Sequence, residues 1–167
     1  VFYCVAALLF VPRTDIIFIS LQGDFVVYDV ESEKRLITIS KTSAEYESIV
    51  SASTHELSAD KKYILLATRL IKLYRHSFFA IWQIYDIENG KIINITVNNE
   101  DPPAYRLVKL SPVGSSMIIV DKFNVYYKSS PDAAAEQITT DGSEVVLYGV
   151  PDWVYEEEIF SSNSAIW

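Results

Sequence analysis

The sequence predicts an all-β fold, a β-propeller fragment of about three blades interrupted by a short helical insertion. Half of the 167 residues are hydrophobic and 13% are aromatic, with Tyr, Val and Ile prominent, a usage typical of strands. Short apolar runs alternate with turn residues along the chain. Short motifs also recur at intervals of 53 and 57 residues, as expected for four-stranded blades. An immunoglobulin-like sandwich is the competing all-β fold, but it predicts no such recurrence.

The first predicted unit contains strands at 15–20, 25–30 and 35–40. The run Leu21-Gln22-Gly23-Asp24 separates the first two strands and is a hairpin signal. The second unit has strands at 62–68, 78–87 and 92–97, and the third at 106–110, 117–121, 124–128 and 137–140. We expect about three blades, which are too few to close a ring.

Two motifs recur between the units. The tetrapeptide 28–31 (Tyr-Asp-Val-Glu) reappears as 85–88 (Tyr-Asp-Ile-Glu), 57 residues later. The tetrapeptide 57–60 (Leu-Ser-Ala-Asp) resembles 110–113 (Leu-Ser-Pro-Val), 53 residues later. These spacings favour repeated blades.

Composition excludes several functional classes. A net charge of -8 argues against a nucleic-acid partner, which would require a basic face. The single cysteine, Cys4, excludes an internal disulfide and a Cys-rich zinc site. With His55 and His76 as the only histidines, we expect no metal site and no cofactor.

Residues 1–14 are set apart from the predicted domain, which spans 15–167. The apolar run 1–11 is shorter than the roughly 20 residues that cross a bilayer, and it lacks a basic leading region. We interpret it as a buried strand or a gene-model junction, with a truncated signal or anchor as the alternative. Because the chain lacks an initiator Met and stops inside an apolar run, we expect it to be a fragment.

Two segments break the repeating pattern and are candidates for function, because loops on a rigid scaffold vary freely. The first is the basic stretch 68–77, which contains Arg75 and His76. The second is the acidic run 152–158 (Asp-Trp-Val-Tyr-Glu-Glu-Glu), which follows Pro151. Apolar residues flank the acids on both sides, so we expect their positions to be fixed.

The acidic run is predicted to be a short helix. Asp152 can serve as its N-cap, and acids in its first turns oppose the positive end of the helix dipole. Tyr155 and Ile159, with Trp153 and Phe160, would pack the helix onto the sheet.

Clustered carboxylates require a cation. A primary ammonium offers three hydrogen-bond donors to two carboxylates, whereas the alternating pattern of a Ca²⁺ loop is missing. A solvated acidic face, or a salt bridge to Arg69, Lys72 or Arg75, is the alternative that remains open.

No catalytic motif stands out in the sequence. The run Gly114-Ser115-Ser116-Met117-Ile118 lacks the last glycine of a nucleophile elbow. His76 is expected to be structural, and His55 to lie in a surface loop. The triplet Asn94-Ile95-Thr96 is a glycosylation sequon, which favours a secreted or extracellular domain.

The acidic run 152–158 resembles the glutamate motif of the dipeptidyl peptidase IV family, in the branch that includes dipeptidyl peptidase IV and fibroblast-activation-protein-like members. The segments 74–78 (Tyr-Arg-His-Ser-Phe), 80–90, 110–114 and 164–167 also resemble that family, so the similarity runs from about residue 15 to the end. The family's fold is an eight-bladed propeller in front of an α/β-hydrolase domain. The resemblance therefore implies that this chain is part of the propeller and that the catalytic domain is absent from it.

The resemblance also implies roles for individual residues. Glu157 and Glu158 would bind the free α-amino group of a peptide substrate, with Glu156 as a supporting neighbour. Arg75 would hold a carbonyl oxygen of the substrate and steady the glutamates. The Ser/Asp/His triad of the family would lie downstream of Trp167.

The activity implied for the parent protein is that of a serine exopeptidase that releases N-terminal dipeptides with Pro or Ala in second position. The alternative is a catalytically inactive relative that acts as a protein-interaction or channel-auxiliary subunit. A homodimer is implied for the full-length protein, either anchored by a single span on the extracellular side of the plasma membrane or secreted.

Overall fold

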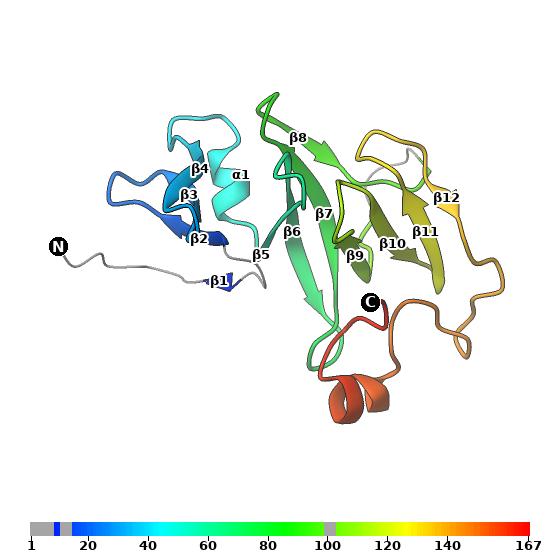
Figure 1. Ribbon diagram of the computed structural model, residues 1–167. Coiled ribbons are helices and arrows are strands. Elements are labelled where there is room, and N and C mark those ends of the chain that lie inside the picture. The colour runs from blue at the N-terminus through cyan, green and yellow to red at the C-terminus, as the bar shows by residue number, and fades with distance from the viewer. Residues whose placement is uncertain (1–8, 11–14, 99–102) are drawn as a thin grey trace.

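Three four-stranded antiparallel sheets follow one another along the chain (Figure 1). The computed structural model describes residues 9–10, 15–98 and 103–167. In each sheet, every strand pairs with its neighbour in sequence, which is the up-and-down meander of a propeller blade. The prediction of an all-β propeller fragment of about three blades is confirmed.

The blades differ mainly in the length of their strands. Blade 1 consists of β1 (Leu9–Phe10), β2 (Asp15–Ile19), β3 (Phe25–Asp29) and β4 (Lys34–Ile39). Blade 2 consists of β5 (Thr54–Leu57), β6 (Tyr63–Lys72), β7 (Phe78–Asp86) and β8 (Lys91–Asn94). Blade 3 consists of β9 (Leu107–Leu110), β10 (Met117–Asp121), β11 (Asn124–Lys128) and β12 (Glu136–Gln137).

Sequence patterns missed two elements: the helix α1 (Tyr46–Val50), which lies between blades 1 and 2, and β5, the first strand of blade 2. His55 lies in β5, so the expectation of a surface loop is wrong. Its Nε2 atom lies 2.6 Å from the Ile49 carbonyl oxygen of α1, and its ring lies 5.4 Å from that of Phe25. The histidine thus joins the second blade to the helix and to the first blade. Of residues 1–14, only Leu9 and Phe10 are described; they pair with β2, and the rest of that prediction lies outside the described residues.

The hydrophobic core lies between the blades, and β6 contributes to both sides of it. Ile64 and Leu66 pack toward blade 1, while Leu65 and Ala67 pack toward blade 3. All four are at most 1% exposed. Because both faces of blade 2 are covered, its central strands read as continuous apolar runs instead of alternating ones. On blade 3, Leu107 and Val120 pack with Val150. Ile166 also packs against this group, so the C-terminal segment covers part of blade 3.

The recurring motifs form matching turns in successive blades. Asp29 ends β3, and its carboxylate accepts hydrogen bonds from the amides of Glu31 and Ser32. Asp86 ends β7, and its carboxylate accepts bonds from the amides of Glu88 and Asn89. The backbone turns left-handed four residues after each aspartate, with φ of 54° at Glu33 and 63° at Gly90.

The second recurring motif forms the first hairpin of blades 2 and 3. The Ser58 amide bonds the Tyr63 carbonyl, and the Ser111 amide bonds the Ser116 carbonyl at the same offset. A left-handed residue follows three positions later in both blades, Lys61 with φ of 60° and Gly114 with φ of 68°. The repeats seen in the sequence therefore correspond to equivalent turns in space.

Candidate functional site

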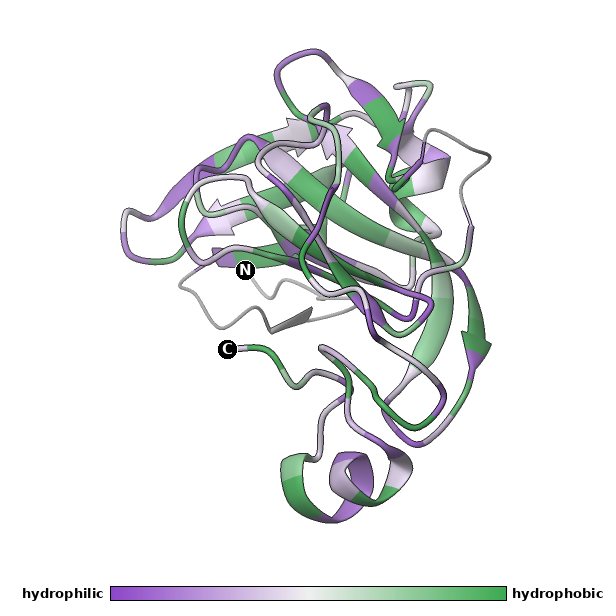
Figure 2. Cartoon of the chain, turned by 90° about the vertical axis from the view of Figure 1, so that its right-hand side faces the viewer, coloured by the Kyte–Doolittle hydropathy of each residue, from purple (hydrophilic) through white to green (hydrophobic). Residues whose placement is uncertain are grey.

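The acidic run forms a short helix that stands apart from the sheets (Figures 1 and 2). Helical backbone begins at Trp153 and continues as the π-helix η1 (Tyr155–Phe160). The Asp152 carboxylate accepts hydrogen bonds from the amides of Val154 and Tyr155, at 2.9 and 3.0 Å, as predicted for an N-cap. The helix ends at Ser161, whose φ is 48°.

The prediction that apolar residues pack this helix onto the sheet is wrong. Trp153, Tyr155 and Ile159 are each at least half exposed, and Phe160 is 36% exposed. The Phe160 ring instead lies between two other rings, with centroids 5.9 Å from Tyr155 and 5.5 Å from Trp167. Each turn of a π-helix holds more residues than an α-helical turn, and here the side facing the blades presents a carboxylate. Polar contacts therefore hold the helix in place.

Glu156 makes the contact between the helix and the second blade. Its side chain is fully buried, at 0% exposure, although carboxylates are seldom buried without partners. Its Oε1 atom accepts hydrogen bonds from the backbone amides of His76 (2.7 Å) and Ser77 (2.8 Å). Both amides belong to the turn between β6 and β7. Glu156 thereby ties the helix to a turn about 80 residues away in sequence.

That turn is carried outward by an extension of the β6–β7 hairpin (Figure 1). The expectation of a loop at 68–77 differs from the structure, because β6 continues to Lys72 through an irregularity between Thr68 and Ile71. Arg69 adopts a φ of 52° there, typical of a bulge. The amides of Leu73 and Tyr74 both bond the Ser77 carbonyl and close the turn.

Arg106 lies at the junction of the hairpin, the helix and blade 3. Its Nη2 atom donates to the Pro151 carbonyl at 2.9 Å, just before the helix begins. Its guanidinium lies 6.0 Å from the centre of the Tyr74 ring. Burial lowers the pKa of Arg106, while the negative charge of Glu156 acts to raise it. For Glu156, burial raises the pKa, but the Ser77 side chain, the two amides and the Arg106 charge together hold it below its usual value.

Sequence reasoning missed Arg106 and Ser77. A single arginine at the start of a strand, or a serine after a histidine, carries no sequence signal for such a contact. Glu156 was expected only to support its neighbours.

Arg75 and Glu157 form the ion pair at the open side of the site. The Arg75 Nη2 atom lies 3.1 Å from Glu157 Oε2, and the Arg75 side chain is 63% exposed. Of the three basic residues considered as partners, Arg75 alone pairs with the acids in the described part of the chain. Lys72 turns back and donates to the Arg75 carbonyl oxygen instead.

Glu158 is exposed, and its side chain makes no hydrogen bond or ion pair within the described residues. The structure thus brings Arg75 and Glu157 together and leaves the carboxylate of Glu158 exposed. The three consecutive glutamates have three different environments: buried, half-buried and exposed.

The described residues contain neither a candidate metal site nor a candidate membrane span. Within 9–10, 15–98 and 103–167, no group of three His, Cys, Asp or Glu side chains could hold a metal ion. No helix in those ranges is long and apolar enough to cross a membrane. Asn94 is exposed at the end of β8, where its side chain accepts a bond from Gln83, and glycosylation there remains a prediction.

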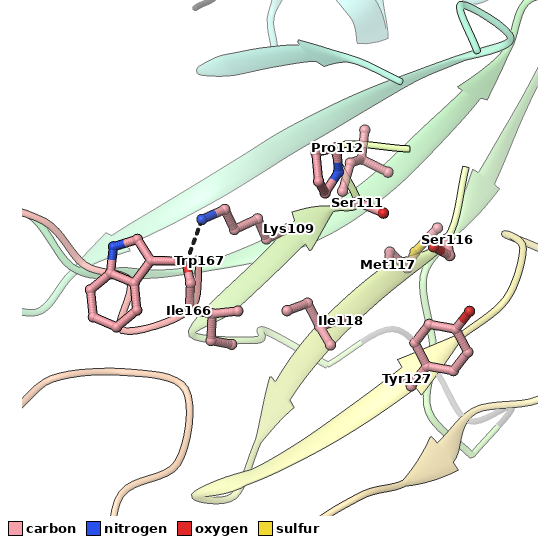
Figure 3. Close-up of a pocket in the computed structure, with 10 residues that line it drawn as sticks. Lys109, Ser111, Pro112, Ser116, Met117, Ile118, Tyr127, Ile166 and Trp167 are labelled. Atoms are coloured by element: carbon pink, nitrogen blue, oxygen red, sulfur yellow. Dashed lines mark hydrogen bonds between the residues drawn. The ribbon is translucent and has the colours of Figure 1, made fainter. Parts of the chain in front are cut away.

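A mainly apolar hollow lies on blade 3, between β9, β10, β11 and the C-terminal segment (Figure 3). Lys109 crosses one side of it and donates to the Ile166 carbonyl oxygen at 2.6 Å. None of its lining residues belongs to the acidic run or to the β6–β7 hairpin that carries Arg75. The hollow is therefore a separate feature from the carboxylate–arginine site.

Four-stranded blades, with a projecting helix and hairpin that pair a glutamate with an arginine, define a β-propeller segment with a charged candidate site. The chain belongs to the dipeptidyl peptidase IV (DPP IV) N-terminal region family, whose sequence profile matches residues 58–167. The match includes Arg75 and the whole acidic run.

Individual relatives agree with this assignment. The chain is 36% identical over 149 residues to prolyl endopeptidase FAP of Bos taurus, covering 89% of the chain and 19% of that protein. It is 36% identical over 118 residues to dipeptidyl peptidase 4 of Sus scrofa, covering 70% and 15% respectively. The crystal structure of Porphyromonas gingivalis dipeptidyl peptidase 4 superposes with a TM-score of 0.75 at 27% identity, covering 98% of this chain and 24% of that one. The chain thus spans about a fifth of the length of its curated relatives.

Proposed function

We propose that this chain is the substrate-binding propeller portion of a serine exopeptidase that releases N-terminal dipeptides with Pro or Ala in second position. In this proposal, Glu157 and Glu158 bind the free α-amino group of the peptide. Arg75 holds a backbone carbonyl oxygen of the bound dipeptide. The catalytic triad belongs to an α/β-hydrolase domain of the parent protein.

The observation that carries the proposal is the pairing of Arg75 with Glu157 beside the unpaired Glu158. One carboxylate is already positioned by a cation 3.1 Å away, and the next is exposed on the same helix. A peptide ammonium has three donors, so it can bond both carboxylates while matching their charge. The arginine keeps further N–H donors for a carbonyl oxygen.

The chemistry of such a site accounts for exopeptidase selectivity. Anchoring the amino terminus fixes how far the chain reaches toward the nucleophile, so the scissile bond two residues along is presented for attack. A peptide without a free amine loses this anchor and also leaves the carboxylates uncompensated. The family membership supports a peptidase as the parent protein.

The test uses the full-length protein and the chromogenic substrate Ala-Pro-p-nitroanilide, with its N-acetylated form for comparison. We expect cleavage of the free amine and little cleavage of the acetylated compound. Glu157→Gln and Glu158→Gln should each lower kcat/KM for the free amine by roughly 10- to 150-fold, the value of one charge-assisted hydrogen bond.

Glu144→Gln is the matched control, because Glu144 is an exposed carboxylate outside the acidic run. Its kcat/KM should equal that of the wild type. Normal turnover by both Glu157→Gln and Glu158→Gln would refute amine binding by these residues.

We also propose that the parent protein is a homodimer and acts on the extracellular side of the plasma membrane or as a secreted form. The exposed Asn94 sequon supports exposure to the secretory pathway.

A further inference from the structure

Two buried charges with no role in binding the peptide amine lie behind the site. Glu156 is fully buried, and Arg106 is half-buried just before β9. Each makes hydrogen bonds to backbone groups of a different segment: the carboxylate to the turn at His76 and Ser77, and the guanidinium to Pro151 before the helix. Together they connect the hairpin, the helix and blade 3.

We propose that Glu156 and Arg106 are a positioning pair that sets Arg75 against Glu157, so that the amine site is assembled before the peptide arrives. This inference rests on the proposed function. Arg75 directly precedes the two residues whose amides Glu156 holds, and Glu157 directly follows Glu156 on the helix. One side chain therefore fixes both halves of the ion pair.

The physical reason is that the apolar residues of the helix leave it unattached. Trp153, Tyr155 and Ile159 are exposed, so packing does not hold the helix against the hairpin. A carboxylate that accepts two amide bonds gives strong, directional attachment. Burying that charge is costly without a nearby cation, and Arg106 supplies it while also fixing the segment that leads into the helix.

A double-mutant cycle in the full-length protein tests the proposal, with Ala-Pro-p-nitroanilide as substrate. Glu156→Gln keeps the side-chain shape but removes the charge. We expect it to lower kcat/KM about tenfold in the wild-type background and less than twofold in an Arg75→Ala background, because the Arg75–Glu157 pair that Glu156 sets in place is already lost there. Equal losses in both backgrounds, or no loss in the wild type, would overturn the proposal.

Arg106 is tested by a pair of substitutions. Arg106→Met keeps the alkyl stem and should lower kcat/KM by about as much as Glu156→Gln, while Arg106→Lys keeps the charge and should restore at least half of the loss on a logarithmic scale. Equal activity of the Met and Lys variants would overturn the role of the charge. Glu136→Gln, which alters an exposed carboxylate on β12, is the control.

Hydrogen exchange supplies a readout that needs no catalysis. In Glu156→Gln, the amides within 73–79 should exchange at least about tenfold faster, since charge-assisted bonds are lost there, and Glu136→Gln should leave them unchanged. Unchanged exchange in Glu156→Gln would overturn the positioning role whatever the activity. If Glu157→Gln and Glu158→Gln reduce turnover but the cycle is additive, the positioning pair fails and the proposed function stands. If those two variants cleave normally, the proposed function fails.

Discussion

Three adjacent glutamates of identical chemistry lie in different environments because the backbone points each in a different direction. Glu156 is buried against two amides, Glu157 is half-buried beside Arg75, and Glu158 is exposed. A carboxylate exposed to water costs little to keep charged, whereas a buried one needs hydrogen bonds or a cation. The buried residue can therefore serve the structure, and the open pair is available to a ligand.

Another residue with a buried polar atom is His55, for which we predict a pH-dependent contribution to stability. Burial lowers the pKa of His55, and the bond to the Ile49 carbonyl offsets this only in part. Its Nδ1 atom is buried without a hydrogen-bond partner among the described residues. The folded state thus disfavours the protonated ring. The contribution of the neutral His55 ring to folding stability is complete above the ordinary histidine pKa of about 6.5, and it is lost as the pH falls below that value.

Urea unfolding of the chain at pH 7.5 and pH 5.5 measures this effect. The wild type should have a lower free energy of unfolding at pH 5.5, and His55→Gln should lose most of that difference. His76→Gln removes the other histidine and should retain it. A wild type that is equally stable at both values would contradict the prediction.

At the scale of elements, the chain builds its site from extensions of a regular blade. The hairpin β6–β7 is longer than the other strand pairs among the described residues, and the irregularity at Arg69 redirects its end toward the helix. The rest of blade 2 keeps the turns that blade 1 also has. The candidate site is thus added at one end of a blade, and the repeated turns of the scaffold are kept.

The repeated aspartate turn leads to a prediction at this scale. Asp86 accepts bonds from the amides of Glu88 and Asn89 and from the Asn89 side chain. Asp86→Ala should therefore destabilise the chain by about 1–2 kcal/mol, lowering Tm by roughly 2 to 8 °C.

Thermal unfolding followed by circular dichroism tests this prediction. Glu88→Ala alters an exposed acid in the same turn and is the control; it should leave Tm nearly unchanged. Equal Tm values for Asp86→Ala and the wild type would refute a stabilising role of the turn.

Across the whole molecule, the blades hold one another through apolar faces, and a lysine salt bridge joins blade 2 to blade 1. Lys61 follows β5, and its Nζ atom lies 3.3 Å from Asp15 Oδ1 and 3.7 Å from Asp29 Oδ2 of blade 1. Asp15 is only 4% exposed, so it depends on this cation. The contact sets the position of blade 2 against blade 1 beside the apolar core.

We predict that Lys61→Met destabilises the chain by about 1 kcal/mol, because it leaves Asp15 buried without a cation while Lys61 itself is partly exposed to water. Lys62→Met removes the neighbouring exposed lysine and should have little effect on urea unfolding. Adding Asp15→Asn to Lys61→Met should recover part of the loss. A double variant less stable than the sum of the single effects would contradict the bridge.

The strands of each blade could be predicted from local patterns, because apolar runs and turn residues act within a few positions. The helix α1 and strand β5 escaped prediction, since Tyr46–Val50 and Thr54–Leu57 carry mixed polar and apolar residues. The acidic helix was predicted with its Asp152 cap, but its apolar side chains were assigned to the wrong environment. The spacing of apolar residues shows which side of a helix is apolar, but it does not show whether that side packs against the protein or faces solvent.

By itself, the sequence determined the all-β class, the repeated blades and the candidate residues Arg75, Glu157 and Glu158. Only the tertiary structure decided that Arg75 pairs with Glu157 and that the buried Glu156 links the helix to the hairpin. The reason is that turns and strands depend on neighbours in sequence, whereas these contacts join segments about 80 residues apart. Their geometry depends on the bulged β6–β7 hairpin and on the π-helix, and neither has a local sequence signature.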